Sequence, residues 1–167
     1  MLVLNIEQLA AAKKLCELLL WQNLENVESA FSSFKDYLAD DYGINNAFRM
    51  SMQRCFYTFD WNEYDLLFVD YLWTTVASLQ IQLPNHLAEV EEISNSEAKD
   101  LFIDVCKVLA EHGFDVWWLA SDMNCLCVVP QKLREEIIKA AITTKLGLSL
   151  PNYFNYTGFK SSNIYCS

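Results

Sequence analysis

The 167-residue chain is 53% hydrophobic and 14% aromatic, with only 4 glycines and 3 prolines, and it carries a formal net charge of −10. This composition excludes a disordered protein, because the apolar side chains are numerous enough to offset the entropy of ordering the chain. The acidity disfavours nucleic acid and anionic membranes as partners, since phosphate would repel it. A basic partner protein would be attracted, and solubility alone is the alternative explanation of the charge.

The excess charge is confined to the first part of the chain. Residues 1–100 hold 16 acidic and 6 basic side chains, a net charge of −10, whereas residues 101–167 hold 6 of each. No apolar run reaches the roughly 20 residues that span a bilayer, and the N-terminus lacks the basic region of a secretory signal peptide. We therefore expect a cytoplasmic protein whose cysteines are reduced and mostly buried: Cys16, Cys55, Cys106, Cys125, Cys127 and Cys166.

Two helices are predicted at the start of the chain. Asn5 and Gln8 have the spacing of a capping box, and apolar residues at helical intervals continue to about Trp21. Asn23 is expected to open a second helix, whose apolar stripe ends before Gly43.

The end of this second helix carries Asp36, Asp40 and Asp41. Acidic side chains oppose the helix dipole there by a few tenths of a kcal/mol each. Either this end is frayed into solvent, or the acids form a patch that is kept for a partner.

The region from Ile44 to Val76 is rich in aromatic residues and is predicted to form two helices around a short break. Asp60 can cap the helix that follows the break, with Glu63 at its third position. Most of the aromatic side chains are expected in the core, although aromatics beside acids also suit a protein interface.

Alternating apolar residues from Leu79 to Leu83, before Pro84, predict a half-buried edge strand. Residues 85–95 favour a loop or a short helix. Glu89, Glu91 and Glu92 make this segment acidic and exposed.

Residues 94–141 carry the clearest signals, in the order helix, strand, turn, strand, helix. Ser94 and Glu97 have capping-box spacing and Gly113 ends the first helix. Strands are predicted at Phe114–Ala120 and Asn124–Val129, joined by a tight turn. Both are apolar on both faces, so they are covered on both sides or have one face open for contacts.

The closing helix begins at Gln131 and is expected to bury one apolar stripe, which consists of Leu133, Ile137, Ile138, Ala141 and Ile142. Leu148 and Leu150 favour a short further strand. The aromatic tail, residues 152–167, is expected to pack along the surface.

These elements predict a single α+β domain over residues 1–167, with N-terminal helices packed on a small, mainly antiparallel sheet and a helix–hairpin–helix unit towards the C-terminus. Residues 1–76 are mainly helical and acidic, residues 78–150 supply the sheet and further helices, and residues 151–167 form a polar aromatic tail.

Metal binding is not expected. Cys125 and Cys127 would share one face of a strand, but a structural zinc site needs four ligands. His86 and His112 have no recognised ligand spacing, and His112 is placed to complement a helix dipole.

Catalysis is not expected either. The chain has no glycine-rich phosphate loop and no nucleophile elbow. Asp60 with Glu63, or Asp100 with Asp104, could be read as paired carboxylates, but such pairs arise by chance among 22 acids. We predict a protein that is not an enzyme and that uses no cofactor.

A small acidic α+β chain that is rich in Trp and Tyr and lacks catalytic signatures resembles the immunity proteins of bacterial polymorphic toxin systems, including contact-dependent growth inhibition. Phe59-Asp60-Trp61 and the hairpin from Gly113 to Pro130, with its Cys125-Leu126-Cys127 run, are also similar to a widespread bacterial domain of uncharacterised function that is suspected of such roles. The resemblance spans residues 55–142. It implies neutralisation of a cognate toxin, often a basic nuclease, by masking its active site.

A basic toxin would be drawn to acidic side chains at an electrostatically enhanced rate, and aromatic side chains could then hold the complex. One alternative is an acidic interaction or adaptor module without a toxin partner. Another is an enzyme with a non-local site, which a pocket joining Asp60, His112 and a thiol would indicate. The acids expected to contact the partner are Asp36, Asp40, Asp41, Asp60, Glu63, Glu89, Glu91 and Glu92.

Overall fold

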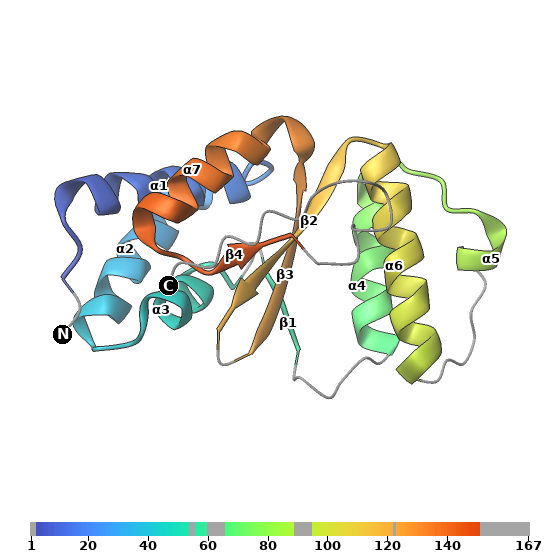
Figure 1. Ribbon diagram of the computed structural model, residues 1–167, viewed down its shortest axis with the longest axis horizontal. Coiled ribbons are helices and arrows are strands. Elements are labelled where there is room, and N and C mark those ends of the chain that lie inside the picture. The colour runs from blue at the N-terminus through green and yellow to red at the C-terminus, as the bar shows by residue number, and fades with distance from the viewer. Residues whose placement is uncertain (1–2, 54–55, 60–65, 89–94, 122, 151–167) are drawn as a thin grey trace.

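The computed structural model describes residues 3–53, 56–59, 66–88, 95–121 and 123–150 (Figure 1). The described helices are α1 (Ile6–Leu19), α2 (Val27–Ala39), α3 (Ile44–Ser51), α4 (Leu66–Ser78), α5 (Asn85–Ala88), α6 (Asn95–Glu111) and α7 (Arg134–Thr144), with 3₁₀ turns at Leu24–Asn26 and Gln131–Leu133. The described strands are β1 (Tyr57–Phe59), β2 (Phe114–Ala120), β3 (Asn124–Pro130) and β4 (Leu148–Ser149). They form one antiparallel sheet in the order β1-β3-β2-β4.

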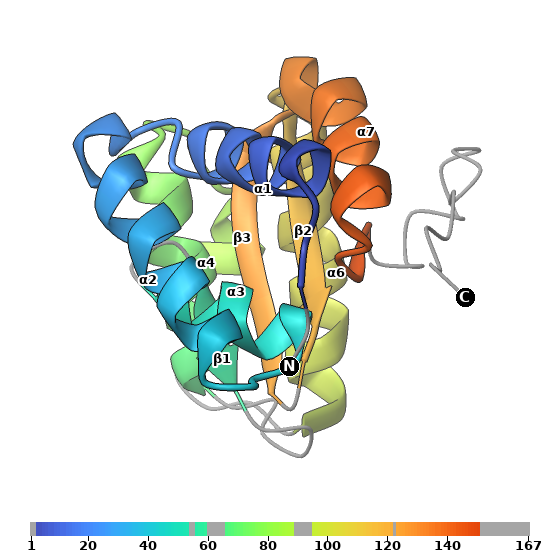
Figure 2. The same ribbon diagram turned by 90° about the vertical axis from the view of Figure 1, so that its left-hand side faces the viewer.

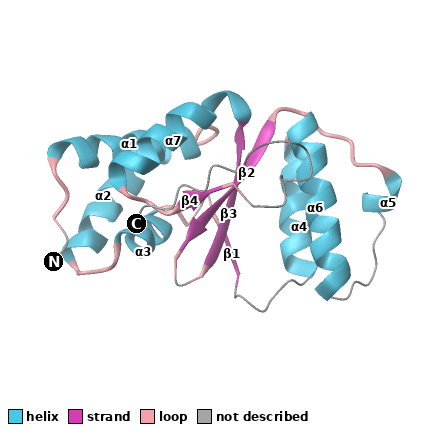
Figure 3. Ribbon diagram, viewed as in Figure 1, coloured by secondary structure: helices cyan, strands magenta, loops and turns pink. Residues whose placement is uncertain are grey.

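Helices cover both faces of this sheet, so the fold has three layers (Figures 1 and 2). The first layer, α1, α2, α3 and α7, packs on one face and shares one hydrophobic core with it. The second layer, α4, α5 and α6, packs on the opposite face around a second core. The predicted α+β class is confirmed, and Figure 3 shows how few strands the helices enclose.

The central hairpin joins the two cores because its side chains alternate between faces. On β2, Trp117 and Leu119 lie in the first core, whereas Val116 lies in the second and Trp118 packs against it. The strand register pairs Trp117 with Cys127 and Trp118 with Leu126. Both predicted strands are therefore confirmed, and both of their faces are covered.

The predicted N-terminal cap of α1 is confirmed. The Gln8 amide donates a hydrogen bond of 2.8 Å to Asn5 Oδ1, and the Asn5 amide donates one of 3.0 Å to Gln8 Oε1. The second predicted helix begins later than expected, because a 3₁₀ turn follows Asn23 and α2 starts only at Val27.

The prediction for residues 44–76 is wrong in one respect, since a strand lies between the two helices. β1 pairs Tyr57 with Leu126 and Phe59 with Asn124 on the central hairpin. Three residues carry too little local pattern to predict a strand, and this one exists because the edge of β3 offers backbone hydrogen bonds. The predicted cap at Asp60 and Glu63 lies outside the described residues, as does the predicted Ser94 cap.

The edge strand predicted at Leu79–Leu83 is also wrong. Gln80 has a left-handed φ of 57°, the amide of Ile81 donates to Val76 O, and the amide of Gln80 donates to Ala77 O. This is a Schellman motif, which ends α4 and folds the buried Ile81 side chain back onto it. The alternation of apolar residues therefore reflects a helix end followed by a loop.

The C-terminal elements follow the predictions with two exceptions. The closing helix begins later than expected, because a 3₁₀ turn at Gln131–Leu133 precedes α7. Gly113 ends α6 with a φ of 82°, and β4 forms at Leu148–Ser149 against β2. Ile142, however, does not line the core, because it lies on the solvent side of α7 and is 53% exposed. None of the described helices has the length and apolarity to cross a bilayer. The predicted packing of the tail concerns residues outside the described ranges.

Candidate partner-binding site

The acids at the end of α2 are held by a Schellman motif of unusual sequence. Asp41 is the left-handed residue, with a φ of 68°. Its amide donates to Leu38 O at 3.2 Å, and the amide of Tyr42 donates to Tyr37 O at 3.2 Å. Glycine is the usual residue in this position, because a Cβ atom costs about 1 kcal/mol in the left-handed region. The end of α2 is therefore ordered by backbone hydrogen bonds, and the alternative of a frayed helix end is not needed.

Two tyrosine rings complete this motif. Tyr37 and Tyr42 meet edge to face, with 5.8 Å between ring centroids. Tyr42 remains 43% exposed. We call Asp36, Tyr37, Asp40, Asp41 and Tyr42 the α2 tip; it presents an aromatic ring among carboxylates, a combination that suits a protein interface.

The charges of the α2 tip are not offset by bases in the last turn of α2. Asp36, Asp40 and Asp41 are all exposed, and that turn has no basic residue. Asp36 and Asp40 are four residues apart, so their like charges repel each other on one face. The nearest base in sequence, Lys35, lies over the Phe31 ring at 5.1 Å from its centroid.

The other predicted contact acids, Asp60, Glu63, Glu89, Glu91 and Glu92, lie outside the described residues. In the chain they flank α4 and precede α6, which belong to the second layer, whereas the α2 tip belongs to the first. Of the eight acids, the structure thus brings three together, Asp36, Asp40 and Asp41 at the end of α2.

The charge of the chain divides in the same way. Residues 55–112, which include the whole second layer, hold eleven acids and two lysines, a net charge of −9. Residues 1–54 have a net charge of −2 and residues 113–167 one of +1. Sequence reasoning placed the excess within residues 1–100, and these sums narrow most of it to residues 55–112.

The thiol groups of the described cysteines are buried. Cys125 and Cys127 share one face of β3, as predicted, and both point into the first core. Burial also raises the pKa of the Cys106 thiol, which keeps it protonated and unreactive. Among the described residues, no three His, Cys, Asp or Glu side chains are grouped as metal ligands.

Two further titratable groups considered from the sequence, Asp104 and His112, make local contacts at the surface. Asp104 forms an ion pair of 2.7 Å with Lys107 on the same helix. His112 is exposed, and its Nδ1 lies 2.8 Å from Val108 O at the end of α6. Both contacts are local to α6 and its C-terminal end, and they stabilise that helix.

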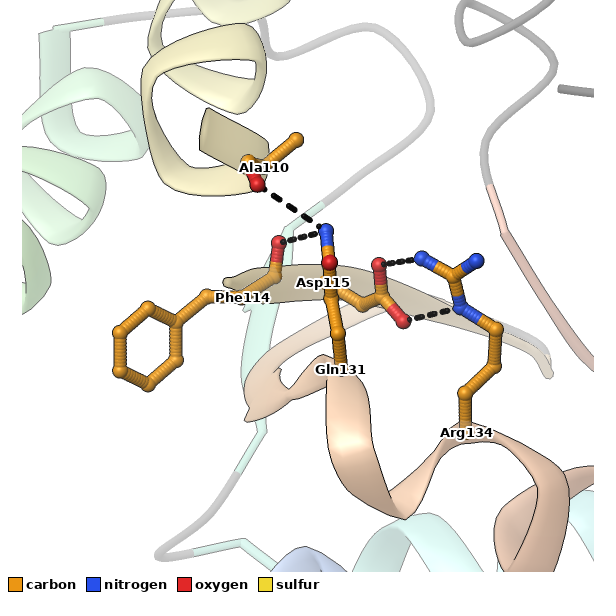
Figure 4. A network of polar contacts seen from close by, with 5 residues as sticks. All are labelled: Ala110, Phe114, Asp115, Gln131 and Arg134. Atoms are coloured by element: carbon orange, nitrogen blue, oxygen red, sulfur yellow. Dashed lines mark hydrogen bonds and ion pairs between the residues drawn. The ribbon is translucent and has the colours of Figure 1, made fainter. Parts of the chain in front are cut away.

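A buried ion pair that sequence reasoning missed joins the sheet to α7 (Figure 4). Asp115, on β2, is 2% exposed, and its two carboxylate oxygens accept hydrogen bonds of 2.6 and 2.7 Å from the Arg134 guanidinium. The hydrogen bond with Asp115 raises the pKa of Arg134. The partners are nineteen residues apart, and the only sequence signal is an acid inside an otherwise apolar strand.

Gln131 extends this network to the second layer. Its side-chain amide donates to Ala110 O at 3.1 Å and to Phe114 O at 3.4 Å (Figure 4). Its backbone amide donates to Gly113 O at 2.8 Å. The network fixes the start of α7 against the end of α6, which is a structural role.

Two hollows are present on the described surface. One is a groove of about 370 Å³ between α1 and α7. The other, about 170 Å³, lies where the end of α1 meets α4 and β3, beside the hydrogen bond of 3.2 Å from Trp21 Nε1 to Val128 O. Among the residues that line them, neither hollow contains a pair of groups arranged for nucleophilic or acid–base catalysis.

Comparisons with known proteins identify no relative. No family model matches the chain, no curated protein is similar to it, and no solved structure matches the fold.

Proposed function

We propose that this protein is a cytoplasmic immunity protein that binds a basic toxin, most simply a nuclease domain, and masks its active site through an acidic surface. Binding, with no chemical step by this chain, is the proposed activity. The support comes from the charge of the chain and from the build of the α2 tip.

The observation that carries the proposal is that the α2 tip lowers the stability of the fold in three ways. Asp41 adopts a left-handed backbone that favours glycine. Asp36 and Asp40 repel each other, and all three acids oppose the helix dipole. Residues and backbone conformations that reduce folding stability are expected where a surface serves binding.

The α2 tip would act in two steps. Its carboxylates would raise the association rate with a basic cleft, an effect that weakens as salt screens the charges. Tyr42 would then lose its remaining exposure against the toxin, because exposed tyrosines provide large contact areas at low entropic cost. The acidic second layer would add a long-range attractive field.

The first test is a search for the partner. The gene is expected directly downstream of a large toxin gene, and co-expression with the toxin domain is expected to restore growth. A bound partner that is harmless to cells would instead favour the adaptor function.

The second test locates the binding surface with a charge-matched pair of variants. The α2 variant combines Asp36→Asn, Asp40→Asn and Asp41→Asn, since asparagine tolerates the left-handed backbone. The control combines Glu25→Gln, Glu111→Gln and Glu135→Gln, which are exposed acids on other elements.

At low salt, the α2 variant should associate with the toxin roughly tenfold more slowly than the control variant. Equal rates for the two variants would show that only net charge matters, and would remove the α2 tip as the site.

A further inference from the structure

The α1–α7 face combines a groove with a balance of acidic and basic side chains. The two helices lie side by side (Figure 2), and the groove between them is floored by small side chains. An ion pair of 3.1 Å between Lys14 and Glu136 joins the two helices, and Glu7 and Thr143 line the same groove. The groove is lined by Glu7, Ala10, Ala11, Lys14, Glu136, Lys139, Ala140 and Thr143.

Each of the two helices that form this groove carries one large exposed apolar side chain. Ile6 is 88% exposed on the solvent side of α1, where Ala10 and Lys14 follow it at four-residue spacing. Ile142 is exposed on α7, three residues beyond Lys139. Single exposed isoleucines are common, but these two lie on the two helices that form one groove.

Both helices are electrically neutral in a chain of net charge −10. α1 contains Glu7, Lys13, Lys14 and Glu17, and α7 contains Arg134, Glu135, Glu136 and Lys139, so each has two acids and two bases. Two copies of so acidic a chain repel each other in most orientations. The repulsion is smallest when the neutral faces meet.

The charges on α1 are also self-complementary. Glu7 and Lys14 are placed symmetrically about Ala10 and Ala11. When two α1 helices meet antiparallel about that centre, Glu7 of each copy faces Lys14 of the other. A two-fold interface repeats every contact twice, so it forms two such pairs. Among the described residues, Glu7 has no ion-pair partner within its own chain.

We infer that the α1–α7 face, which comprises Ile6, Glu7, Ala10, Lys14, Lys139 and Ile142, binds a second copy of this chain to form a two-fold dimer. Ile6 and Ile142 lose their exposed apolar area in the contact, and the paired charges set its antiparallel register. The α2 tip is not part of this face.

The size of the face sets the expected affinity. A 14-residue helix such as α1 is roughly 21 Å long and about 10 Å wide, so two helices offer roughly 400 Å² per copy. A total of roughly 800 Å² is below the roughly 1,200 Å² of stable interfaces, so a weak contact is expected. Dimerisation is therefore expected at roughly 10–100 µM protein.

The test is sedimentation velocity of the full chain over a concentration range of roughly 1–300 µM, which brackets the expected affinity. The wild type should shift from monomer to dimer with rising concentration. Glu7→Lys and Lys14→Glu should each remain monomeric, because like charges then face each other. An equimolar mixture of the two variants should dimerise, since opposite charges face each other at both positions only in the mixed pair.

Ile6→Asp and Ile142→Asp provide a second test that leaves the Lys14–Glu136 ion pair intact. Both side chains are exposed, so the thermal midpoint should stay within a few degrees while dimerisation is lost. The triple α2 variant should dimerise like the wild type.

A wild type that stays monomeric at every concentration would overturn the inference. Dimers that persist in both charge variants, or a variant mixture that stays monomeric, would overturn it as well.

Discussion

The two helical layers differ in how many basic side chains accompany their acidic ones. In the first layer, lysines offset the acids across elements, with Lys13 joined to Glu28 at 2.5 Å and Lys14 to Glu136 at 3.1 Å. The chain segment that contains the second layer has eleven acids and two lysines. Within this layer, the α2 tip stands out because it gathers three exposed acids, Asp36, Asp40 and Asp41.

The largest expected effect tests whether the layers are independent units. Phe34 and Phe102 are both fully buried, one in each core. Truncation of either side chain to alanine should lower the free energy of unfolding by roughly 3–5 kcal/mol, because each leaves a cavity. Both variants should unfold in one urea transition, since the cores share the central hairpin. A two-step transition in only one variant would show that the two layers unfold independently.

A smaller effect concerns the network that fixes α7. Arg134→Ala removes both donors from the buried Asp115 carboxylate and should destabilise the fold by about 3 kcal/mol. Lys132→Ala, an exposed change two residues earlier, is the control and should cost less than about 0.5 kcal/mol. Equal denaturation midpoints for these two variants would contradict a structural role for the ion pair.

The next effect contrasts the left-handed caps of the two layers. Asp41→Gly and Gln80→Gly should each stabilise the fold by roughly 0.5–1 kcal/mol, because glycine accepts the positive φ without strain. Thermal unfolding measures this gain. Only Asp41→Gly should also weaken toxin binding. A loss of binding in Gln80→Gly alone would move the site to the second layer.

The smallest effect is a pH dependence on the first layer. The hydrogen bond with Glu28 raises the pKa of Lys13. The stabilisation from this pair is therefore fully present below the ordinary lysine pKa and is lost as pH rises through the raised value. The stability difference between wild type and Lys13→Met should be constant from about pH 7 to about pH 9 and should shrink towards about pH 11. A difference that grows with pH would refute this assignment.

Sequence reasoning succeeded where a local pattern determines the structure. The Asn5 cap and the alternation along β2 need only neighbouring residues, and both are as predicted. β1 was missed because its three residues become a strand only through pairing with β3, more than sixty residues away in the chain. The strand predicted at Leu79–Leu83 failed because alternation also arises where a left-handed Gln80 turns the chain back.

The residues of the candidate site were predicted from the sequence, but their backbone conformation was not. The misfit of acids at a helix end was visible in the sequence, and Asp36, Asp40 and Asp41 are indeed exposed. The left-handed conformation of Asp41 was not predictable, because Gly43 was the better local candidate for a helix stop. Gly43 instead precedes the first residue of α3.

The side chains of β2 alternate between the two faces of the sheet, so each core contacts one of two neighbouring tryptophans. Trp117 and Trp118 are neighbours in the chain, yet the first lies in the core under α1 and the second packs against the core under α6. A variant that keeps only one of these two indoles, with the other four tryptophans of the chain replaced by phenylalanine, has an emission that follows a single half of the molecule. The two sides of the sheet can thus be observed separately, without any dye, as the chain folds or meets a partner.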